Sequence, residues 1–344
     1  MSSDDRLRIG VLGAAKIARL FVDAVRPSRK VLVAAVASRD LERAADFARE
    51  HGIAKAHSSY ETLLVDPSID AVYVPLPNNL HAKWAIAAAD AGKHVLCEKP
   101  LAATAAEAMT IFEAARRNGV YIVEGYPYRA QPQTLKLREL LVAGTVGNLQ
   151  LIQASFGFPL TDPANIRMNP ALAGGALMDA GSYPVSLLRM VTNSVPARVH
   201  ALAQWSPSGV DVTTLASLQY ASGLLAQISC SFATARHRHA FIAGDAGSIS
   251  TTYLNDTSAT FPALLEVRHG TGWDARREVI ETESAVGFLA EADAFRDLIT
   301  HGWGEWAGAS PQESIDIALT LDALALSART GTSVEVNAQT QGGA

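Results

Sequence analysis

Short apolar runs alternate with longer alanine-rich runs over the first 124 residues of the chain. The apolar runs are rich in Val, Ile and Tyr, which is typical of strands buried on both faces of a parallel sheet. They are Leu7–Leu12, Val31–Ala37, Ala71–Pro75, His94–Glu98 and Tyr121–Glu124. This order predicts βαβ units and an α/β fold.

Helices are predicted between these strands because the intervening segments consist of strong helix formers. They are Lys16–Val25, Leu41–His51, His81–Ala91 and Ala105–Asn118. Gly52, Gly92 and Gly119 follow three of them. Glycine is the usual residue just past a helix, so these positions support the predicted ends.

The pattern changes near Gly125. One helical stretch, Pro132–Ala143, precedes several β-type runs with no long helix between them, which favours an antiparallel sheet. The runs are Leu149–Phe156, Ala197–Gln204, Thr213–Tyr220, Leu224–Phe232 and Ala263–His269. Helices return at Gly287–His301 and Gln312–Thr330, followed by a short strand, Val334–Val336, and a polar tail from Asn337.

The chain of 344 residues exceeds the usual span of one hydrophobic core, so we expect two domains. The first, residues 1–124, is a doubly wound α/β domain. The second, residues 125–344, is an α+β domain with an open, mostly antiparallel sheet, and its terminal helices can pack back on the first domain.

Composition narrows the class of partner. A net charge of −5 gives no basic footprint for nucleic acid or an anionic membrane surface, so a small-molecule partner is favoured. Cys97 and Cys230 belong to no metal or disulfide motif, so we predict no metal site. No apolar run reaches the roughly 18 residues that cross a bilayer. The first residues lack the pattern of a secretory signal, so we expect a cytoplasmic protein.

A candidate nucleotide site follows the first strand, where Gly13-Ala14-Ala15-Lys16-Ile17-Ala18 leads into a helix. Gly13 permits a tight turn, and the small residues that follow let the backbone approach a pyrophosphate at the helix N-terminus. Only Gly13 is a glycine of the dinucleotide pattern. The alternative is a plain βα turn of the same topology.

Ser38 stands at the end of the second strand, where NAD-preferring folds place an acidic residue. With Arg39 beside it and Arg43 one helical turn further on, it could bind a 2′-phosphate through charge-assisted hydrogen bonds. This arrangement favours NADP over NAD. The alternative is that Ser38 is only the N-cap of the next helix, with the arginines on a solvated face.

Two further blocks carry a family resemblance: Pro75-Leu76-Pro77-Asn78-Asn79-Leu80-His81, and Glu98-Lys99-Pro100 just past Ala91-Gly92-Lys93-His94. Their order resembles the Gfo/Idh/MocA family of oxidoreductases, over nearly the whole chain. The resemblance implies an N-terminal Rossmann domain with Lys99 beside the nicotinamide. A lysine at the carboxyl end of a central parallel strand also faces the ligand crevice, where it can transfer a proton; a surface lysine is the alternative.

The resemblance leaves two readings of His81: it lines the nicotinamide pocket, or it only starts a helix. We expect Asn78 and Asn79 to hold the loop and the cofactor through backbone geometry rather than to react.

Asp179 and Tyr183 follow a glycine-rich loop at a spacing of four, which places them on one helix face if a helix starts near Asp179. A carboxylate and a phenol there could bind sugar hydroxyls and pass a proton toward Lys99. The family motif ends in His or Tyr. Tyrosine resembles the branch of glucose-fructose oxidoreductase, dihydrodiol dehydrogenase and bacterial D-xylose dehydrogenase. The alternatives are an N-cap for Asp179 and a core aromatic for Tyr183.

The stretches around Tyr126 and Arg167 also resemble that branch. Ala173 replaces its usual glycine, and Pro127 follows Tyr126 directly. Both departures bear on the shape of the substrate pocket.

The predicted enzyme is an NAD(P)-dependent dehydrogenase or reductase that moves a hydride between the nicotinamide and the hydroxyl or carbonyl carbon of a sugar or sugar-like polyol. The alternatives are a trans-dihydrodiol dehydrogenase of the same fold and a non-catalytic NAD(P)-binding sensor. By the resemblance, the active site lies between the domains, and the C-terminal sheet forms a homodimer or a dimer of dimers.

The predicted catalytic residues are Lys99, Tyr183 and Asp179. The predicted cofactor-binding residues are Gly13, Ala14, Ala15, Lys16, Ile17, Ser38, Arg39, Arg43, Leu76, Pro77, Asn78, His81, Glu98, Lys99 and Arg129. The predicted substrate-binding residues are Tyr126, Arg167, Asp179 and Tyr183.

Overall fold

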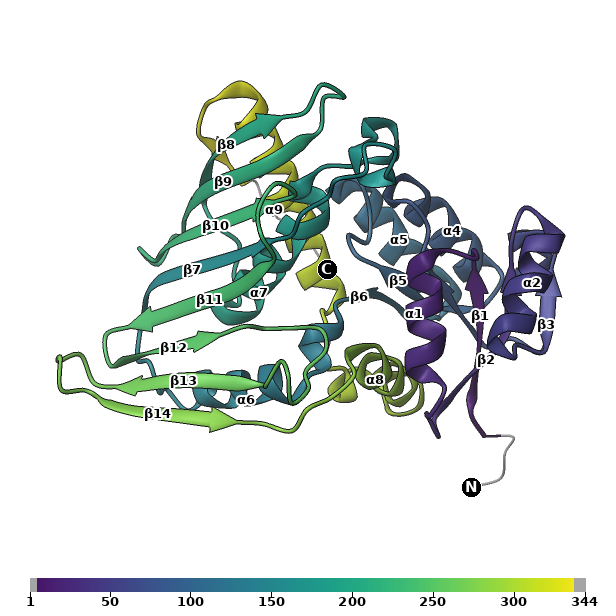
Figure 1. Ribbon diagram of the computed structural model, residues 1–344, viewed down its shortest axis with the longest axis horizontal. Helices are drawn as coiled ribbons and strands as arrows, with labels where there is room; N and C mark the ends of the chain where they lie inside the picture. The colour runs from purple at the N-terminus through teal and green to yellow at the C-terminus, as the bar shows by residue number, and fades with distance from the viewer. Residues whose placement is uncertain (1–4, 337–344) are drawn as a thin grey trace. The chain divides into compact units, whose positions relative to one another are not determined.

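The computed structural model describes residues 5–336, and the chain divides into two compact units (Figure 1). Unit 1 comprises the residues up to Gln131 together with Ala285–Pro311. Unit 2 comprises Pro132–Ser284 and the residues from Gln312 onward. The predicted polar tail from Asn337 lies outside the described residues. The division into a nucleotide-binding domain up to residue 124 and a substrate-binding domain from residue 125 stays a prediction.

Unit 1 contains a six-stranded parallel sheet in the order β3-β2-β1-β4-β5-β6. The strands are β1 Leu7–Leu12, β2 Val31–Ala37, β3 Lys55–His57, β4 Ala71–Val74, β5 His94–Glu98 and β6 Ile122–Gly125. The strand order reverses between β1 and β4, and ligands of such sheets bind outside the carboxyl ends of the strands at this reversal. The expected α/β doubly wound fold is confirmed.

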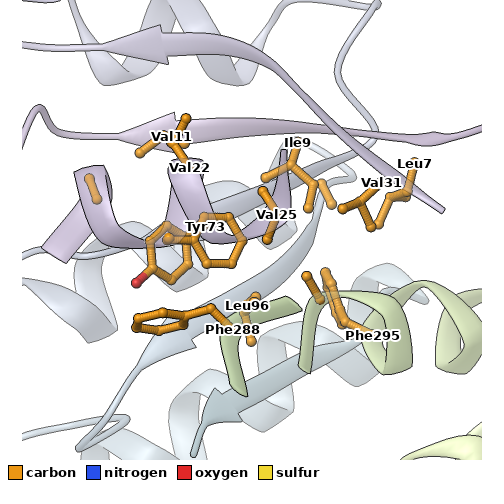
Figure 2. Close-up of a cluster of buried hydrophobic side chains, with 14 of the residues drawn as sticks. Leu7, Ile9, Val11, Val22, Val25, Val31, Tyr73, Leu96, Phe288 and Phe295 are labelled. Carbon is orange, nitrogen blue, oxygen red and sulfur yellow. The ribbon is translucent and has the colours of Figure 1, made fainter. Parts of the chain in front are cut away.

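The helices of unit 1 are α1 Lys16–Val25, α2 Leu41–His51, α3 Tyr60–Leu64, α4 Asn78–Asp90, α5 Ala105–Asn118 and α8 Gly287–His301. α1 and α8 share one buried cluster with β1 and β4 (Figure 2). The Phe21 ring stacks on Tyr73 with centroids 3.9 Å apart and meets the edge of Phe288 at 5.8 Å. Each such buried ring stabilises the fold by about 1.5–3 kcal/mol. α8 therefore completes the core of unit 1 although it follows unit 2 in the chain.

Unit 2 contains a nine-stranded sheet in the order β14-β13-β12-β11-β7-β10-β9-β8-β15. All pairs are antiparallel except β7 with β10. The strands are β7 Leu149–Gly157, β8 Arg198–Trp205, β9 Asp211–Gln219, β10 Leu225–Ser231, β11 His237–Gly244, β12 Gly247–Thr251, β13 Leu264–His269, β14 Arg276–Glu281 and β15 Val334–Glu335. The helices are α6 Pro132–Val142, α7 Ser182–Thr192 and α9 Pro311–Thr330. The expected open, mostly antiparallel sheet is confirmed.

The two faces of this sheet differ. The inner face is buried beneath helices such as α7 and α9 (Figure 1), and Ile152 and Ala154 of β7 point into it. The outer face carries exposed leucines that are neighbours across strands: Leu202 pairs with Leu215, and Leu225 with Leu151. Contiguous exposed apolar side chains of this kind mark interaction surfaces.

Most predicted elements lie within two residues of their predicted bounds. α4 is an exception, because it begins at Asn78, three residues before the predicted start, with Pro77 in the N-cap position. Asn78 and Asn79 are therefore helical, and their assignment to a loop was wrong. The unpredicted elements are β3, α3, β11, β12 and β14.

Candidate active site

Gly13 forms the turn between β1 and α1. Its φ of +114° is one that side-chain-bearing residues rarely adopt, and an added Cβ would lie 3.2 Å from Leu76 Cδ2. The helix that follows has Ala15 as its N-cap, which offers no side-chain acceptor to the first N–H groups. Lys16 and Ile17 are the first residues of this helix, so a cradle of backbone donors suited to an anion lies at the turn.

A hollow of about 480 Å³ adjoins this turn on the side of α2. Its lining includes Ala14, Lys16, Arg19 and Arg43. Arg43 Nη2 donates a hydrogen bond to the Ala14 carbonyl at 2.9 Å, which fixes a guanidinium beside the phosphate cradle. The carboxylates of Asp40, Glu42 and Asp46 also line the hollow, so it is the turn, with the N–H groups at the start of α1, that fits the phosphate-bearing end of a dinucleotide.

Ser38 is buried at the end of β2, and its hydroxyl accepts a hydrogen bond from the Asp40 N–H at 3.3 Å. Asp40, not Ser38, is the N-cap of α2, because its carboxylate accepts from the N–H groups of Glu42 and Arg43. The alternative role of Ser38 as this N-cap was therefore wrong. Arg39 is exposed.

Tyr60 was missed by the sequence reasoning. Its hydroxyl lies 3.5 Å from the position of an added Gly13 Cβ, so it borders the turn. Burial raises the pKa of Tyr60, while the positive charges of Arg39 and Arg43 act in the opposite direction. Both guanidinium groups therefore lie close enough to influence this corner of unit 1. A single tyrosine at the start of a five-residue helix gave no signal of this role.

His81 is completely buried in the first turns of α4. One ring nitrogen lies 2.8 Å from the Pro100 carbonyl and the other 2.7 Å from the Leu76 carbonyl. Burial lowers the pKa of His81, and the Lys99 charge acts in the same direction. The imidazole thus ties the segment after β4 to the segment after β5. Its predicted direct contact with the cofactor stays a prediction.

Lys99 follows β5 directly and is half-buried. The preceding Glu98 is buried at the strand end, and Tyr73 donates a hydrogen bond to its Oε1 at 2.6 Å. Lys99 therefore stands at the carboxyl edge of the parallel sheet, on the strand next to β4. This is the edge at which doubly wound sheets bind ligands.

A second buried carboxyl, Glu291 of α8, lies beneath this strand end. It is 2% exposed, and within residues 5–336 its Oε2 has no hydrogen-bond partner. It lies beside Gly125, where an added Cβ would be in ordinary contact with both carboxyl oxygens at 3.6 Å. Burial raises the pKa of Glu291 well above its usual range, the Glu98 charge raises it further, and an N–H of Tyr126 acts in the opposite direction. Burial therefore favours the protonated form of the Glu291 carboxyl in the folded protein.

We expect Glu291→Gln to raise the melting temperature by a few degrees at pH 8 and by less at pH 5. A carboxyl with a raised pKa keeps its proton in the folded state while the unfolded chain loses it, so stability falls as pH rises between the two pKa values. Glutamine removes this loss. Thermal unfolding at several pH values measures the effect, with Glu113→Gln on the exposed side of α5 as control. A constant difference across pH would contradict the assignment.

Tyr126 and Arg129 lie next to β6, and each is only 1% exposed. Their predicted contacts with substrate and cofactor stay predictions. In unit 1 the structure thus brings the glycine turn, Arg43, Leu76 and Lys99 to the carboxyl edge of one sheet, with His81 and Glu291 buried behind it.

In unit 2, Asp179 lies in a π-helical turn, Leu177–Gly181, that precedes α7. Its Oδ2 accepts a hydrogen bond from Arg167 Nε at 2.7 Å, so the two predicted substrate-binding residues form an ion pair. Asp179 is inside a helical segment, and its alternative role as an N-cap was wrong. Single π-helical turns occur frequently at functional sites.

The glycine loop before this turn is closely packed. An added Cβ at Gly174 would lie 2.4 Å from the Arg167 carbonyl oxygen, and one at Gly175 would lie 2.2 Å from Asp211 Oδ1. Asp211 in turn accepts the Leu177 N–H at 2.7 Å. The loop thus fixes the start of the turn that carries Asp179, a function that sequence reasoning did not assign to Asp211.

Ala173, which replaces the family's usual glycine, has a left-handed backbone with φ 55° and ψ 46°. An alanine in that region costs roughly 1–2 kcal/mol. We expect Ala173→Gly to raise the free energy of unfolding by about 1 kcal/mol in denaturant titrations, after the greater flexibility of glycine in the unfolded chain is subtracted. The control, Ala171→Gly in the adjacent 3-10 helix, should lower it by about 0.5–1 kcal/mol. Equal effects of the two changes would argue against this account.

Tyr183 stands in the first turn of α7 and is 6% exposed. Its phenolic oxygen accepts a hydrogen bond from Asn255 Nδ2 at 3.0 Å. The Arg238 guanidinium lies 4.1 Å from its ring centroid. Tyr183 is therefore a buried aromatic with a hydrogen-bonded hydroxyl, an arrangement that fits a core residue as well as a catalytic one, and its catalytic role stays a prediction. Sequence reasoning named neither Asn255 nor Arg238.

The described part of the chain holds neither a metal-binding cluster nor a membrane-spanning helix. Residues 5–336 contain no group of three or more His, Cys, Asp or Glu side chains placed to hold a metal ion. No helix within the same residues has the length and apolar character needed to cross a membrane.

Unit 1 carries a doubly wound sheet with a phosphate cradle. Unit 2 of the same chain presents a paired carboxylate and a hydrogen-bonded phenol. This combination defines a dinucleotide-dependent oxidoreductase. Residues 7–126 match the model of the oxidoreductase family with an NAD-binding Rossmann fold, and residues 134–250 match that of the GFO/IDH/MocA C-terminal domain. The chain belongs to the GFO/IDH/MocA family.

Two curated relatives agree with this assignment. A D-xylose 1-dehydrogenase (NADP(+)) from Haloferax volcanii is 38% identical over 335 residues, covering 96% of this chain and 100% of that protein. A trans-1,2-dihydrobenzene-1,2-diol dehydrogenase from Mus musculus is 37% identical over 245 residues, covering 70% of this chain and 73% of the mouse protein.

Among solved structures, a 3-ketoreductase from Actinomadura kijaniata in complex with NADP matches with a TM-score of 0.84 and 29% identity, covering 94% of this chain and 98% of that one. A levoglucosan dehydrogenase, at 24% identity and a TM-score of 0.84 over 96% and 99% of the two chains, supports the fold. The expected fold class, the NAD(P) cofactor and the oxidoreductase activity are confirmed.

Proposed function

We propose that this protein oxidises or reduces a sugar or sugar-like polyol with NADP as the preferred cofactor. The observation that carries the substrate class is its similarity to the Haloferax D-xylose dehydrogenase, at 38% identity over 96% of this chain. The paired Asp179 and Arg167 fit that class, because hydroxyl groups need both donors and acceptors.

The turn at Gly13 would hold the pyrophosphate, with the first N–H groups of α1 as donors. When bound, the cofactor supplies a hydride acceptor in oxidation and a hydride donor in reduction. Ser38, Arg39 and Arg43 would bind the 2′-phosphate of NADP. Arg43 supports this preference, since its hydrogen bond to Ala14 fixes a cation beside the cradle.

In the oxidative direction, Tyr183 takes the proton of the reacting hydroxyl with the assistance of Lys99, while Asp179 and Arg167 orient the substrate. In reduction, Tyr183 returns the proton to the forming hydroxyl. Tyr183 suits this role because its oxygen already receives the Asn255 N–H, a donor that stabilises negative charge on the phenol. His81 contributes by lying between the Leu76 and Pro100 carbonyls, and as a neutral imidazole it donates a hydrogen bond to one of the two.

Absorbance of the reduced nicotinamide, followed with a panel of aldoses, polyols and dihydrodiols and with NAD and NADP separately, tests this proposal. We expect turnover with at least one aldose or polyol, and a higher kcat/KM with NADP. The Arg43→Ala variant should reduce this NADP preference by about tenfold, because it removes one charge-assisted contact. Turnover with dihydrodiols alone would refute the sugar-like substrate class. An unchanged ratio of kcat/KM with NADP to kcat/KM with NAD in Arg43→Ala would refute the role of Arg43 in the cofactor preference.

A trans-dihydrodiol dehydrogenase is the second candidate. It is favoured by the 37% identity to the mouse enzyme that carries this name, although that match covers 70% of the chain rather than nearly all of it. The same panel separates the two, because the dihydrodiols and the aldoses are tested side by side. Cofactor binding without turnover of any substrate would instead support the third alternative, a non-catalytic NAD(P)-binding sensor.

We also propose that the protein is cytoplasmic and forms a homodimer, or a dimer of dimers, through the outer face of the nine-stranded sheet. The exposed leucines of that face support this. We expect Leu215→Glu to shift the mass measured by light scattering to that of the monomer, because it places a charge beside Leu202 in a buried interface. Leu326→Glu on the exposed side of α9 is the control. An unchanged mass for Leu215→Glu would exclude this interface.

A further inference from the structure

Arg238 is an arginine that points into unit 2. On β11, Arg238 is partly buried and Ala240 and Ile242 are fully buried, while His237 and His239 on either side of Arg238 are exposed. The register places Arg238 opposite Phe156 of β7, on the face of the sheet that α7 covers. A guanidinium at such a position requires an explanation, since charged side chains are rarely buried without a partner or a function.

Three aromatic rings surround this guanidinium. Its central carbon lies 4.1 Å from the ring centroid of Tyr183, 4.5 Å from that of Tyr253 and 4.9 Å from that of Phe156. Phe156 also meets the Tyr183 ring edge-on at 5.3 Å. A cation over the face of a ring is attracted to its π electrons, and the attraction grows when the phenol becomes a phenolate.

Asn255 joins the arginine to the phenol. Arg238 Nη1 donates to Asn255 Oδ1 at 3.2 Å, and Asn255 Nδ2 donates to the Tyr183 oxygen at 3.0 Å. Because arginine only donates hydrogen bonds, the amide must turn its oxygen to Arg238 and therefore its NH₂ group to Tyr183. The hydrogen bond from Arg238 thus fixes the orientation of this amide, and the phenolic oxygen accepts a hydrogen bond from its NH₂ group.

The segment that carries Asn255 is held in a strained conformation. Tyr253 has a φ of 37°, which is unusual for a residue with a side chain, and it is completely buried. Its hydroxyl donates to the Ser155 carbonyl at 2.8 Å, and its N–H donates to Thr251 Oγ1 at 3.1 Å. Strain of this kind persists only where surrounding contacts enforce it, and it concentrates at functional sites.

The other ionisable groups near Tyr183 do not oppose this arrangement. Asp179 on the preceding turn is paired with Arg167. Burial raises the pKa of Cys230 on β10 well above its usual range, so this group stays a neutral thiol. Asp256, next to Asn255, is exposed. Arg238 is therefore the cation whose distance to the Tyr183 ring favours a phenolate.

We infer that Arg238 and Asn255 are positioning residues that hold the Tyr183 side chain and stabilise its phenolate, the ionised form that accepts the substrate proton and becomes the neutral phenol. This inference rests on the proposed function, in which Tyr183 takes that proton. Arg238 acts through the ring and also orients the Asn255 amide, which acts through the phenolic oxygen.

The experiment compares Arg238→Met, Arg238→Lys and Asn255→Asp with the parent protein. Met keeps an unbranched apolar stem and removes the charged guanidinium, whereas Asp keeps the shape of the amide and replaces its donor by an acceptor. We expect kcat in the oxidative direction to fall about tenfold or more for Met and Asp, with the substrate KM changed by less than about threefold, because the lost interaction acts on the phenolate. Arg238→Lys should recover part of the rate.

A spectroscopic titration provides a readout that needs no substrate. The difference in tyrosinate absorbance between each protein and its Tyr183→Phe counterpart reports the ionisation of Tyr183. We expect its midpoint to move to higher pH by about one unit in Arg238→Met and in Asn255→Asp. Arg236→Met is the matched control, because Arg236 is exposed and its guanidinium lies 5.8 Å from a different ring, Phe158.

The two readouts separate the possible failures. A shifted titration in a protein that turns over no sugar would keep the inference about Tyr183 and reject the proposed function. Unchanged titration midpoints in both Arg238→Met and Asn255→Asp, with native circular dichroism, would overturn the inference. If Arg238→Met does not fold, Asn255→Asp decides by the same criterion.

Discussion

Lys99→Met is expected to lower kcat by about 10³-fold or more while the dissociation constant of the cofactor changes by less than about threefold. The ammonium group at the end of β5 is proposed to assist proton transfer, and both its charge and its hydrogen bonds are lost in methionine, which keeps a similar length. Single-turnover kinetics measure the chemical step, and fluorescence of bound reduced cofactor measures the affinity.

Lys83→Met is the control for this change. Lys83 is exposed on α4, and its Nζ lies 4.9 Å from the ring centroid of Trp84. Its replacement removes one positive charge from the same unit without affecting the carboxyl edge of the sheet, so kcat should stay at the parent value. Full activity of Lys99→Met would eliminate the proposed role of Lys99 in the chemistry.

Tyr183→Phe is expected to lower kcat by about 10²- to 10⁴-fold, the usual range for the loss of a general acid or base. The ring and its contacts with Phe156 and Arg238 remain in this variant, so the fold should be preserved. The substrate KM should rise only a few-fold, because the hydroxyl is proposed to act mainly on proton transfer in the transition state.

Tyr220→Phe removes a hydroxyl from another buried tyrosine of unit 2 and serves as the matched control. Burial raises the pKa of Tyr220 to about 12, with a hydrogen bond from Thr192 acting in the opposite direction, so its hydroxyl stays neutral. We expect this variant to keep the parent kcat. A Tyr183→Phe protein as active as Tyr220→Phe would disprove the assignment of the proton to Tyr183.

The sequence predicted unit 1 closely because its signals are local. β1, β2 and β5 have the predicted bounds, since each is a short apolar run bordered by turn residues. The turn at Gly13 was found in the same way, because strand, glycine and helix follow one another directly. Lys99 needed the family resemblance in addition, since a lysine at a strand end has no distinctive local pattern.

The residues that were missed depend on contacts between distant segments. Glu291 is one polar residue on a helix, and only the fold brings it to Glu98, about 190 positions earlier in the chain. Asn255 and Tyr60 are single polar residues in short connections. Arg238 did leave a signal, because it has the same phase on its strand as Ala240 and Ile242, but β11 was not recognised and so the phase was not examined.

The place of α8 in the core of unit 1 has a consequence for the order of synthesis. Phe288 and Phe295 belong to the same buried cluster as Tyr73 (Figure 2), and Phe288 meets the Phe21 ring edge-on, so the hydrophobic core around α1 closes only after the ribosome has made all of unit 2 up to Ser284. An apolar face of the nascent nucleotide-binding unit therefore stays uncovered while the nine-stranded sheet of unit 2 is translated. A chain that stops before α8 would carry every residue of the phosphate cradle and still lack the layer that encloses its core.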